Sequence, residues 1–339
     1  MDKGIDFVIL WVDGNDPKWK EEKNKYWNRL YYNTNKDGNG DERFRDWNNL
    51  KYWFRAVEKY APWVRKIHFV TYNQIPEWMN VNAEKLHIVN HSDFIDNKYL
   101  PTFNCNPLEI NLHRIKGLSE NFVYFNDDMF LTRSVSSNLF FKNNLQRECA
   151  ILYPLANTDI NDSFNYLMLS NTGIINDKFN LKQSFKSNFG KWINISYGKS
   201  NIINLFMGMV YSNISGITIP HLPSALKKST YEEVWNLYSE KLNETTAHKF
   251  RNVTDVTQYL FRYWEIMKGN FIPTKYTDFG KCFYLQEDNV DELCRAIENK
   301  KYDMICINDT KSLVDFGKIK NKINNSFEKV LPEKSSFEL

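Results

Sequence analysis

The sequence predicts an α/β protein with a mostly parallel sheet flanked by helices and a more helical second half. The first observation is the apolar run at 6–12, whose length and continuous hydrophobicity are typical of a strand buried on both faces of a parallel sheet. The second is the alternation of strand-like and helix-like segments up to about residue 135. The third is the composition, because 42% hydrophobic and 25% charged residues in a chain of 339 support a large core and exclude general disorder.

The helices of the first half have recognisable starts and stops. Asp16-Pro17 places an N-cap residue before a proline and predicts a helix that continues through Leu30. Apolar residues at helical spacing predict a second helix at 50–61, which a proline ends. Asn106, with Glu109 three residues later, has the pattern of a capping box and predicts the start of a third helix.

Short apolar runs between these helices predict further strands at 66–72, 85–90 and 121–126. Strand, helix and strand in repetition are typical of a Rossmann-like core. We therefore expect three parts. They are an α/β half at 1–135, a second half at 136–315 whose helical region completes the site, and a C-terminal tail at 316–339.

The tail has the pattern of an amphipathic helix. Its apolar positions at helical spacing are Phe316, Ile319, Ile323 and Phe327, and its lysines include Lys318, Lys320 and Lys322. Such a helix can lie on a membrane surface, or it can pack on the rest of a soluble protein. The sequence leaves both interpretations open.

Charge, hydropathy and cysteines limit the partners and the compartment. A net charge of +3 argues against a nucleic-acid partner. The longest apolar run, 202–220, is interrupted by polar residues, so no transmembrane helix is expected. The five cysteines lack CxxC spacing and fit reduced thiols, so we expect a cytoplasmic protein, peripheral to the membrane if the tail binds there. The aromatic content of 16% fits a large core or a carbohydrate-binding surface.

Polar side chains follow the predicted strands at the points where the strands end, which is where open α/β sheets bind ligands. Asp13, Asn15 and Asp16 follow the first strand, and Asp127 and Asp128 follow the fourth. Two carboxylates at a strand end can hold a divalent cation such as Mg²⁺ or Mn²⁺. The competing interpretation is a solvated turn or a helix cap.

Three more groups are candidates on residue type. Glu109, His113 and Arg114 would lie within one and a half turns of one helix, as an acid/base and phosphate-binding group. A capping role for Glu109 competes with this interpretation. His221 lies between two prolines in a loop, and Arg251 would ordinarily be a solvated charge; spacing alone assigns neither a function.

Four blocks in a fixed order carry a resemblance to a known family. The first is DFVILWVDGNDP at 6–17, and the second, at 43–131, includes YAPWVR and YFNDD. The third covers 221–263, and the fourth is CIND at 306–309. With these blocks the sequence resembles the Stealth family of sugar-phosphate transferases, which includes bacterial capsule enzymes and the catalytic subunit of the phosphotransferase that tags lysosomal enzymes. One departure is Tyr-Asn-Gln at 72–74, where the family usually has Asn/Asp-Gly-Gln.

The resemblance implies a nucleotide-sugar-transferase-like fold and a reaction. Family enzymes transfer a sugar 1-phosphate from a nucleotide-diphosphate sugar to an acceptor hydroxyl, and so form a phosphodiester and release a nucleoside monophosphate. We therefore expect transfer of hexose- or N-acetylhexosamine-1-phosphate from a UDP-sugar to a glycan or lipid-linked glycan, with release of UMP, in capsular or cell-surface polysaccharide synthesis. The alternatives are a metal-dependent glycosyltransferase with the same donor, and a non-catalytic glycan-binding protein.

The resemblance also implies catalytic residues and adds Asp309 to the site. The strand ends suggest the other acidic residues and Asn15, and three arginines are secondary candidates for phosphate contacts. The expected catalytic residues are Glu109, Asp128, His221 and Arg251. The expected ligands of Mg²⁺ or Mn²⁺ are Asp127, Asp128 and Asp309. The expected nucleotide-sugar contacts are Asp13, Asn15, Asp16, Arg43, Arg65 and Arg114. Either His221 or Glu109 would take the proton of the acceptor hydroxyl, and the sequence leaves that choice open.

Overall fold

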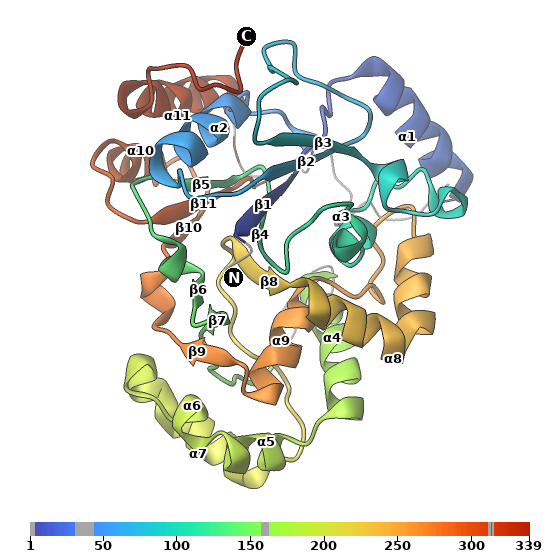
Figure 1. Cartoon of the computed structure of the whole chain (residues 1–339), viewed down its shortest axis with the longest axis vertical. Coiled ribbons are helices and arrows are strands. Elements are labelled where there is room, and N and C mark those ends of the chain that lie inside the picture. The colour runs from blue at the N-terminus through green and yellow to red at the C-terminus, as the bar shows by residue number, and fades with distance from the viewer. Residues whose placement is uncertain (1–3, 31–43, 157–162, 311–312, 314) are drawn as a thin grey trace.

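The computed structural model describes residues 4–30, 44–156, 163–310, 313 and 315–339, and it is an α/β protein as predicted. A five-stranded sheet with the order β3-β2-β1-β4-β8 lies at its centre (Figure 1). The strands are β1 (Ile5–Leu10), β2 (Ile67–Thr71), β3 (Leu86–Asn90), β4 (Asn121–Phe125) and β8 (Ser224–Lys227). The first four are parallel to one another, and β8 is antiparallel to β4. The expectation of a mostly parallel sheet is confirmed.

The pairing register brings the carboxyl ends of the strands to one edge of the sheet. Ile9 of β1 lies opposite Phe69 on β2 and Phe125 on β4. All six residues of β1 are buried, as the continuous apolar run predicted for a strand covered on both faces. The segments that follow these strands therefore emerge side by side, which is the arrangement that a site at this edge requires.

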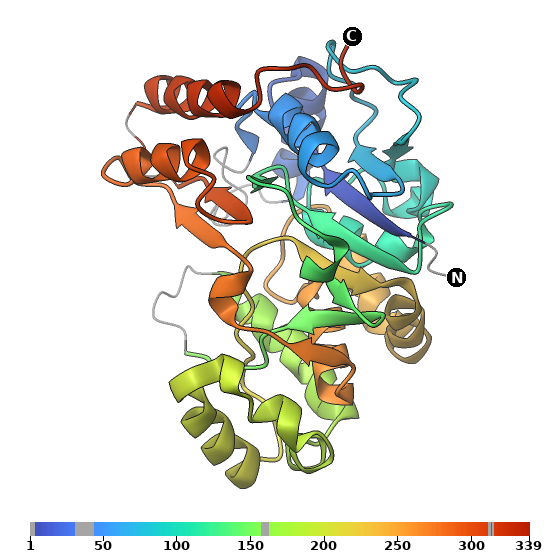
Figure 2. The same cartoon turned by 60° about the vertical axis from the view of Figure 1, so that its left-hand side comes forward.

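Helices cover both faces of the sheet (Figures 1 and 2). On one side lie α2 (Leu50–Tyr60), α10 (Val290–Glu298) and α11 (Phe316–Val330), and on the other lie α3 (Cys105–Glu109) and α8 (Lys228–Ala247). Helix α2 is amphipathic and buries Trp53 and Phe54 completely. The other α-helices are α1 (Pro17–Leu30), α4 (Ser163–Lys178), α5 (Leu181–Ser187), α6 (Phe189–Trp192), α7 (Asn201–Val210) and α9 (Tyr259–Lys268).

Two small sheets extend the core. One has the order β10-β11-β5, with β10 (Lys281–Tyr284), β11 (Met304–Asn308) and β5 (Met129–Leu131). The other has the order β6-β7-β9, with β6 (Phe141–Lys142), β7 (Leu145–Glu148) and β9 (Phe271–Pro273). Because β11 pairs antiparallel with β5, the end of β11 comes next to the turn that precedes β5.

The two halves expected at 1–135 and 136–315 share their main sheet. Strand β8 comes from the second half, and its Leu226 lies opposite Phe122 on β4 of the first half. Strand β11 likewise pairs with β5 of the first half. Within the described ranges, no helix is both long enough and apolar enough to cross a membrane.

The C-terminal helix α11 packs on the protein through its apolar face. Ile323 and Phe327 are fully buried, and the Phe327 ring stacks on Tyr52 of α2 with ring centroids 5.5 Å apart. Beyond the helix, Glu338 accepts two hydrogen bonds of 2.8 Å from the Arg55 guanidinium. Of the two interpretations of the tail, the structure therefore supports the packing helix, because the apolar face is occupied by the core.

Candidate active site

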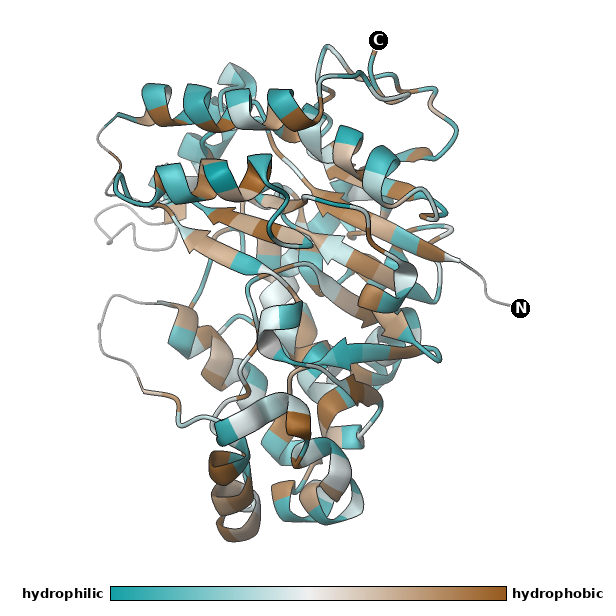
Figure 3. Ribbon diagram, turned by 90° about the vertical axis from the view of Figure 1, so that its left-hand side faces the viewer, coloured by the Kyte–Doolittle hydropathy of each residue, from teal (hydrophilic) through white to brown (hydrophobic). Residues whose placement is uncertain are grey.

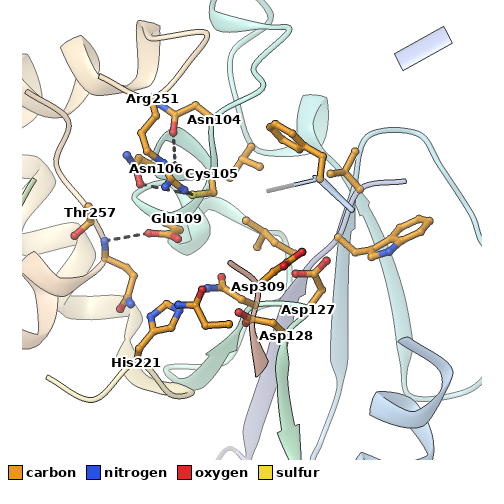
Figure 4. A pocket seen from close by; sticks show the side chains of 18 of the residues that line it. Asn104, Cys105, Asn106, Glu109, Asp127, Asp128, His221, Arg251, Thr257 and Asp309 are labelled. Carbon is orange, nitrogen blue, oxygen red and sulfur yellow. Dashed lines mark hydrogen bonds between the residues drawn. The ribbon is translucent and has the colours of Figure 1, made fainter. Parts of the chain in front are cut away.

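A cavity of about 630 Å³ lies at the carboxyl edge of the central sheet. Its wall includes residues that follow β1, β3, β4 and β11. Six residues that the sequence predicted as catalytic or metal-binding line it, and Figure 4 shows how they lie. They are Glu109, Asp127, Asp128, His221, Arg251 and Asp309. Residues as far apart in the sequence as Glu109 and Asp309 are thus brought to one cavity.

The acidic side of the cavity is the turn between β4 and β5. The Ile307 N–H of β11 donates to the Asp128 carbonyl at 2.8 Å, and this brings Asp309 next to the turn (Figure 4). Asp127 is exposed to the cavity, but the surrounding protein atoms displace much of the water around its carboxyl group. This desolvation, together with the carboxylates of Asp128 and Asp46, raises the pKa of Asp127 to about 7. Carboxylates crowded in this way favour a shared proton or a bound cation.

Sequence analysis missed two charged residues of this side, Arg45 and Asp46. Arg45 Nη1 lies 3.7 Å from Asp309 Oδ1, and burial raises the pKa of the Asp46 carboxyl. The segment 45–48 has no helix or strand, so no periodicity pointed to it. Their position near the start of the second family block, at 43–131, could have marked Arg45 and Asp46 as site candidates.

His221 lies beside the acidic turn. Its Nδ1 is 3.0 Å from the Tyr259 hydroxyl at the start of α9, which holds the imidazole ring in place. The Cys306 thiol donates to Asp128 Oδ2 at 3.4 Å. Atoms of Asp128, His221 and Cys306 that could bind a metal lie within 4.8 Å of one another. His221, to which spacing alone assigned no function, therefore lies next to Asp128, a predicted metal ligand. Sequence analysis did not include Tyr259 or Cys306 among the expected site residues.

Glu109 lies at the back of the cavity, and its capping box is not formed. Helix α3 begins two residues earlier than expected, and its N-cap is Asn104, which accepts a hydrogen bond from the Asn106 N–H at 3.1 Å. Glu109 instead accepts hydrogen bonds from the Tyr124 hydroxyl at 3.0 Å and from the Gln258 N–H at 3.4 Å. Burial raises the pKa of the Glu109 carboxyl, although these hydrogen bonds and a nearby arginine oppose the shift.

The expected group of Glu109, His113 and Arg114 is wrong. Helix α3 ends at Glu109, so the three side chains do not share one helical face. The ring centroids of His113 and Trp235 are 5.8 Å apart, and the Arg114 guanidinium lies 4.2 Å from the same indole centroid. Neither residue lines the cavity. They pack against α8 instead, and the structure removes Arg114 from the expected phosphate contacts.

Arg251 comes from the loop that joins α8 to α9. Its Nη2 lies 3.1 Å from Cys105 Sγ at the cavity wall (Figure 4). The Cys105 sulfur, and after it the carboxylates of Glu109 and Asp255, raise the pKa of the guanidinium above its ordinary value. A positive charge is therefore held permanently in the wall opposite the acidic turn.

The loop that carries Arg251 is fixed by Asp255, a fully buried carboxylate that sequence analysis missed. Asp255 Oδ2 accepts hydrogen bonds from the side-chain amides of Asn104 and Asn106, at 2.7 and 2.9 Å. The same oxygen accepts the Asn252 N–H at 3.1 Å, and Oδ1 lies 2.5 Å from His248 Nδ1. One carboxylate thus joins the loop to the start of α3, and so sets Arg251 against Cys105.

We expect Asp255→Asn to lower the free energy of unfolding by about 1.5–3 kcal/mol, because it replaces a charged acceptor with an amide that cannot satisfy all these donors. Urea denaturation would measure the change, and transfer activity should fall as the Arg251 loop loosens. The exposed Asp288→Asn is the matched control and should change neither quantity. An Asp255→Asn protein as stable as the parent would contradict this role.

Several expected nucleotide-sugar contacts lie elsewhere. Arg65 binds Asp6 at the start of β1, with Nε 2.8 Å from Oδ1, at the edge of the sheet opposite the cavity, so its expected contact with the donor is wrong. Arg43 lies outside the described residues. The loop residues Asp13, Asn15 and Asp16 do not line the cavity; two residues just before them do. These two are Trp11 and Val12.

Comparison with known proteins gives the family. Sequence models of Stealth protein conserved regions 1, 2 and 3 match residues 3–31, 43–149 and 220–263. A capsular polysaccharide phosphotransferase WcwK of Streptococcus pneumoniae is 42% identical over 334 residues, which cover 98% of each chain. The chain belongs to the Stealth family. The fourth block expected, at 306–309, stays a prediction, although the structure places it in the site.

Other relatives agree with membership of the Stealth family. A receptor polysaccharide phosphotransferase WefC of Streptococcus gordonii is 38% identical and covers 100% of both chains. The chain is accordingly an enzyme of the phosphotransferase class. Among solved structures, mouse xyloside xylosyltransferase 1 aligns with 90% of this chain and 97% of its own at a TM-score of 0.37 and 10% identity, which is too distant to support a functional conclusion.

The departure from the Stealth pattern at 72–74 leaves the turn intact. Asn73 has a φ of 54°, in the left-handed region that glycine favours and asparagine tolerates. Gln74 then accepts the Asp13 N–H at 2.9 Å and donates to Asp16 Oδ2 at 3.0 Å. The asparagine therefore replaces the usual glycine without loss of the contact between the ends of β1 and β2.

Proposed function

We propose that this Stealth enzyme transfers a hexose or N-acetylhexosamine 1-phosphate from a UDP-sugar to a hydroxyl of a glycan acceptor, and releases UMP, in the synthesis of a capsular or other cell-surface polysaccharide. The names of its relatives support the polysaccharide phosphotransferase class. The observation that carries the proposal is the convergence of six predicted residues on one cavity of about 630 Å³. That volume suits a ligand of nucleotide-sugar size.

The acidic turn has the donor chemistry that a hard divalent cation prefers. Asp127, Asp128 and Asp309 offer carboxylate oxygens, and Asn308 offers an amide oxygen, at the same side of the cavity. Desolvation raises the pKa of Asp127, and the neighbouring carboxylates of Asp128 and Asp46 raise it further. A cation bound there would offset the repulsion among these carboxylates. We assign Mg²⁺, or Mn²⁺, to these residues. Bound there, it would neutralise charge on the diphosphate and on the departing UMP.

His221 is the proposed general base. Its Nδ1 is engaged with the Tyr259 hydroxyl, so with that nitrogen protonated Nε2 can accept the proton of the acceptor hydroxyl. The acceptor oxygen then forms a bond to the phosphorus next to the sugar, and the bond from that phosphorus to the UMP oxygen breaks. The bond between the sugar and its phosphate oxygen is untouched, so the anomeric configuration is retained.

Arg251 and Glu109 complete the opposite wall. The guanidinium of Arg251 can stabilise the charge that builds up on the phosphoryl oxygens. Both oxygens of Glu109 already accept hydrogen bonds, one from Tyr124 and one from the loop after Arg251. Glu109 therefore suits a positioning role for that loop and for the sugar better than a role as base. The nucleotide would lie at the end of β1, against Trp11 and Val12.

Product analysis tests this function. The purified chain, a panel of UDP-sugars, Mg²⁺ and a glycan acceptor should release UMP in step with formation of a phosphodiester, which chromatography and phosphorus NMR detect. UDP-N-acetylhexosamine is the first donor to try. Release of UDP with a new glycosidic bond would instead assign a glycosyltransferase. Release of neither nucleotide with any donor would contradict both activities.

A further inference from the structure

The helices α5, α6 and α7 form the end of the molecule farthest from the C-terminal helix (Figures 1 and 3). Helix α7 exposes apolar side chains there. Ile202 is 72% exposed, Phe206 59% and Met209 65%. Figure 3 shows this end of the molecule with a helix coloured as hydrophobic along much of its length. We name the α7 patch after its five members, Ile202, Leu205, Phe206, Met209 and Val210.

Helix α7 is anchored so that this face cannot turn inward. Asn204 on the inner face is fully buried and makes three hydrogen bonds of 2.7–2.8 Å, with the Leu152 N–H and with the carbonyls of Ala150 and Trp192. Gly208 lies so close to the Phe185 ring that a Cβ there would be only 2.3 Å from a ring carbon. The inner face is therefore fixed by specific contacts, and the outer face is left apolar.

The charge along the segment that contains the patch has one sign. The sequence from 178 to 231 contains no aspartate or glutamate, while it contains seven lysines. Lys178, Lys186 and Lys199 of this segment are exposed. Phe189 on α6 and Ile195 in the following turn add exposed apolar surface, at 51% and 96%. An apolar helix face flanked by lysines has the composition of a helix that lies in the interface of a negatively charged bilayer.

We propose that the α7 patch and its flanking lysines dock the enzyme onto an anionic lipid bilayer. The apolar side chains at 202, 205, 206 and 209 follow helical spacing and would enter the boundary between headgroups and acyl chains. The lysines would contact lipid phosphates. A bilayer suits this surface because the patch itself offers no hydrogen-bonding side chains that would orient a protein partner.

This surface is connected to the active-site cavity. Helix α4 lines the cavity with Phe164 and Leu167. The chain then continues from α4 into α5, α6 and α7. The first two turns of α4 line the cavity and its last turn leads to α5, so α4 joins the cavity to the docking end of the molecule. The inference does not depend on the proposed reaction, because lipid binding is measured without substrate.

Vesicle sedimentation tests the proposal. The purified full chain should sediment with phosphatidylcholine vesicles that contain phosphatidylglycerol, and not with phosphatidylcholine alone. Two double variants test the two parts of the surface, Ile202→Ser/Phe206→Ser and Lys186→Glu/Lys199→Glu. In each, the fraction of protein bound to vesicles should fall at least about tenfold. Added salt should weaken binding of the parent protein. Each variant should keep the melting temperature and the transfer activity toward a water-soluble acceptor, because these residues lie outside the cavity.

Matched controls change the same chemistry elsewhere. Leu237→Ser removes a side chain of α8 that is 50% exposed, and Lys25→Glu/Lys116→Glu makes the same charge change at other exposed sites. Both controls should bind vesicles like the parent. Failure of the parent to bind anionic vesicles, or equal binding by the α7 double variant, would overturn the proposal. So would a parent dimer that this variant converts to a monomer in sedimentation velocity, because a second copy would then cover the patch.

Discussion

Replacing Asp128 with asparagine is expected to lower transfer at least about a hundredfold. Asp128 lies in the acidic turn, with Oδ2 3.4 Å from Cys306 Sγ and its carbonyl bound by Ile307 of β11. The substitution keeps the size of the side chain and the backbone contact, but it removes the negative charge that a cation would bind. Steady-state transfer over a series of Mg²⁺ concentrations would measure the loss.

The Asp128→Asn protein should also require more Mg²⁺ for half its own maximal rate, and its melting temperature should stay within a few degrees of the parent. Asp303→Asn is the matched control, since Asp303 pairs with Arg133 away from the cavity. It should change neither quantity. Near-normal turnover by purified Asp128→Asn would remove this residue from the mechanism.

Replacing His221 with alanine is expected to lower transfer by about a hundredfold to ten-thousandfold, the range of a lost general base. The loop at His221 holds the imidazole beside Asp128 and against Tyr259, so the substitution leaves a space at the reacting centre. Added imidazole should restore part of the rate, because it can accept the proton from that space. Single-turnover measurements would separate this effect from product release.

Two further variants test whether His221 or Glu109 is the base, and the rescue experiments test whether His221 is instead a metal ligand. Tyr259→Phe should lower transfer less than His221→Ala, because it loosens the ring without removing it. Glu109→Ala leaves space for a small carboxylate, and it should show no rescue by added formate if Glu109 only positions its neighbours. If imidazole failed to rescue His221→Ala while extra Mg²⁺ did, His221 would be a metal ligand rather than the base.

Much of the fold could be predicted because its signals are local. The apolar run of β1, the Asp16-Pro17 start of α1 and the stop after α2 are each encoded within a few residues, and the structure has these elements within about two residues of the expected bounds. The acidic turn was predictable for the same reason, since it directly follows a buried strand. The membership of His221 and Arg251 in the site came from the family resemblance, because loop residues carry no periodicity.

The wrong predictions arose where one local sequence pattern is compatible with more than one structure. Asn104 and Asn106 can each cap α3; in the structure Asn104 is the cap, and the buried Asp255 binds the side-chain amides of both residues. The contacts with Asp255 join residues about 150 positions apart, and no local pattern contains them. The apolar run at 202–220 was tested only as a possible membrane span, whereas its first half forms a surface helix anchored by Asn204.

The hydrogen bond from Ile307 to the Asp128 carbonyl has a consequence for how the enzyme is made. Asp309 follows β11, a strand close to the end of the chain, while its neighbours Asp127 and Asp128 follow β4 in the first half. A ribosome must therefore synthesise β11 and Asp309, far along the chain from β4, before Asp309 can join the carboxylates of the acidic turn. Until then β5 also lacks its partner strand, so a growing chain or a chain truncated before β11 would carry an incomplete site. Activity should consequently appear only after β11 has been synthesised and has paired with β5.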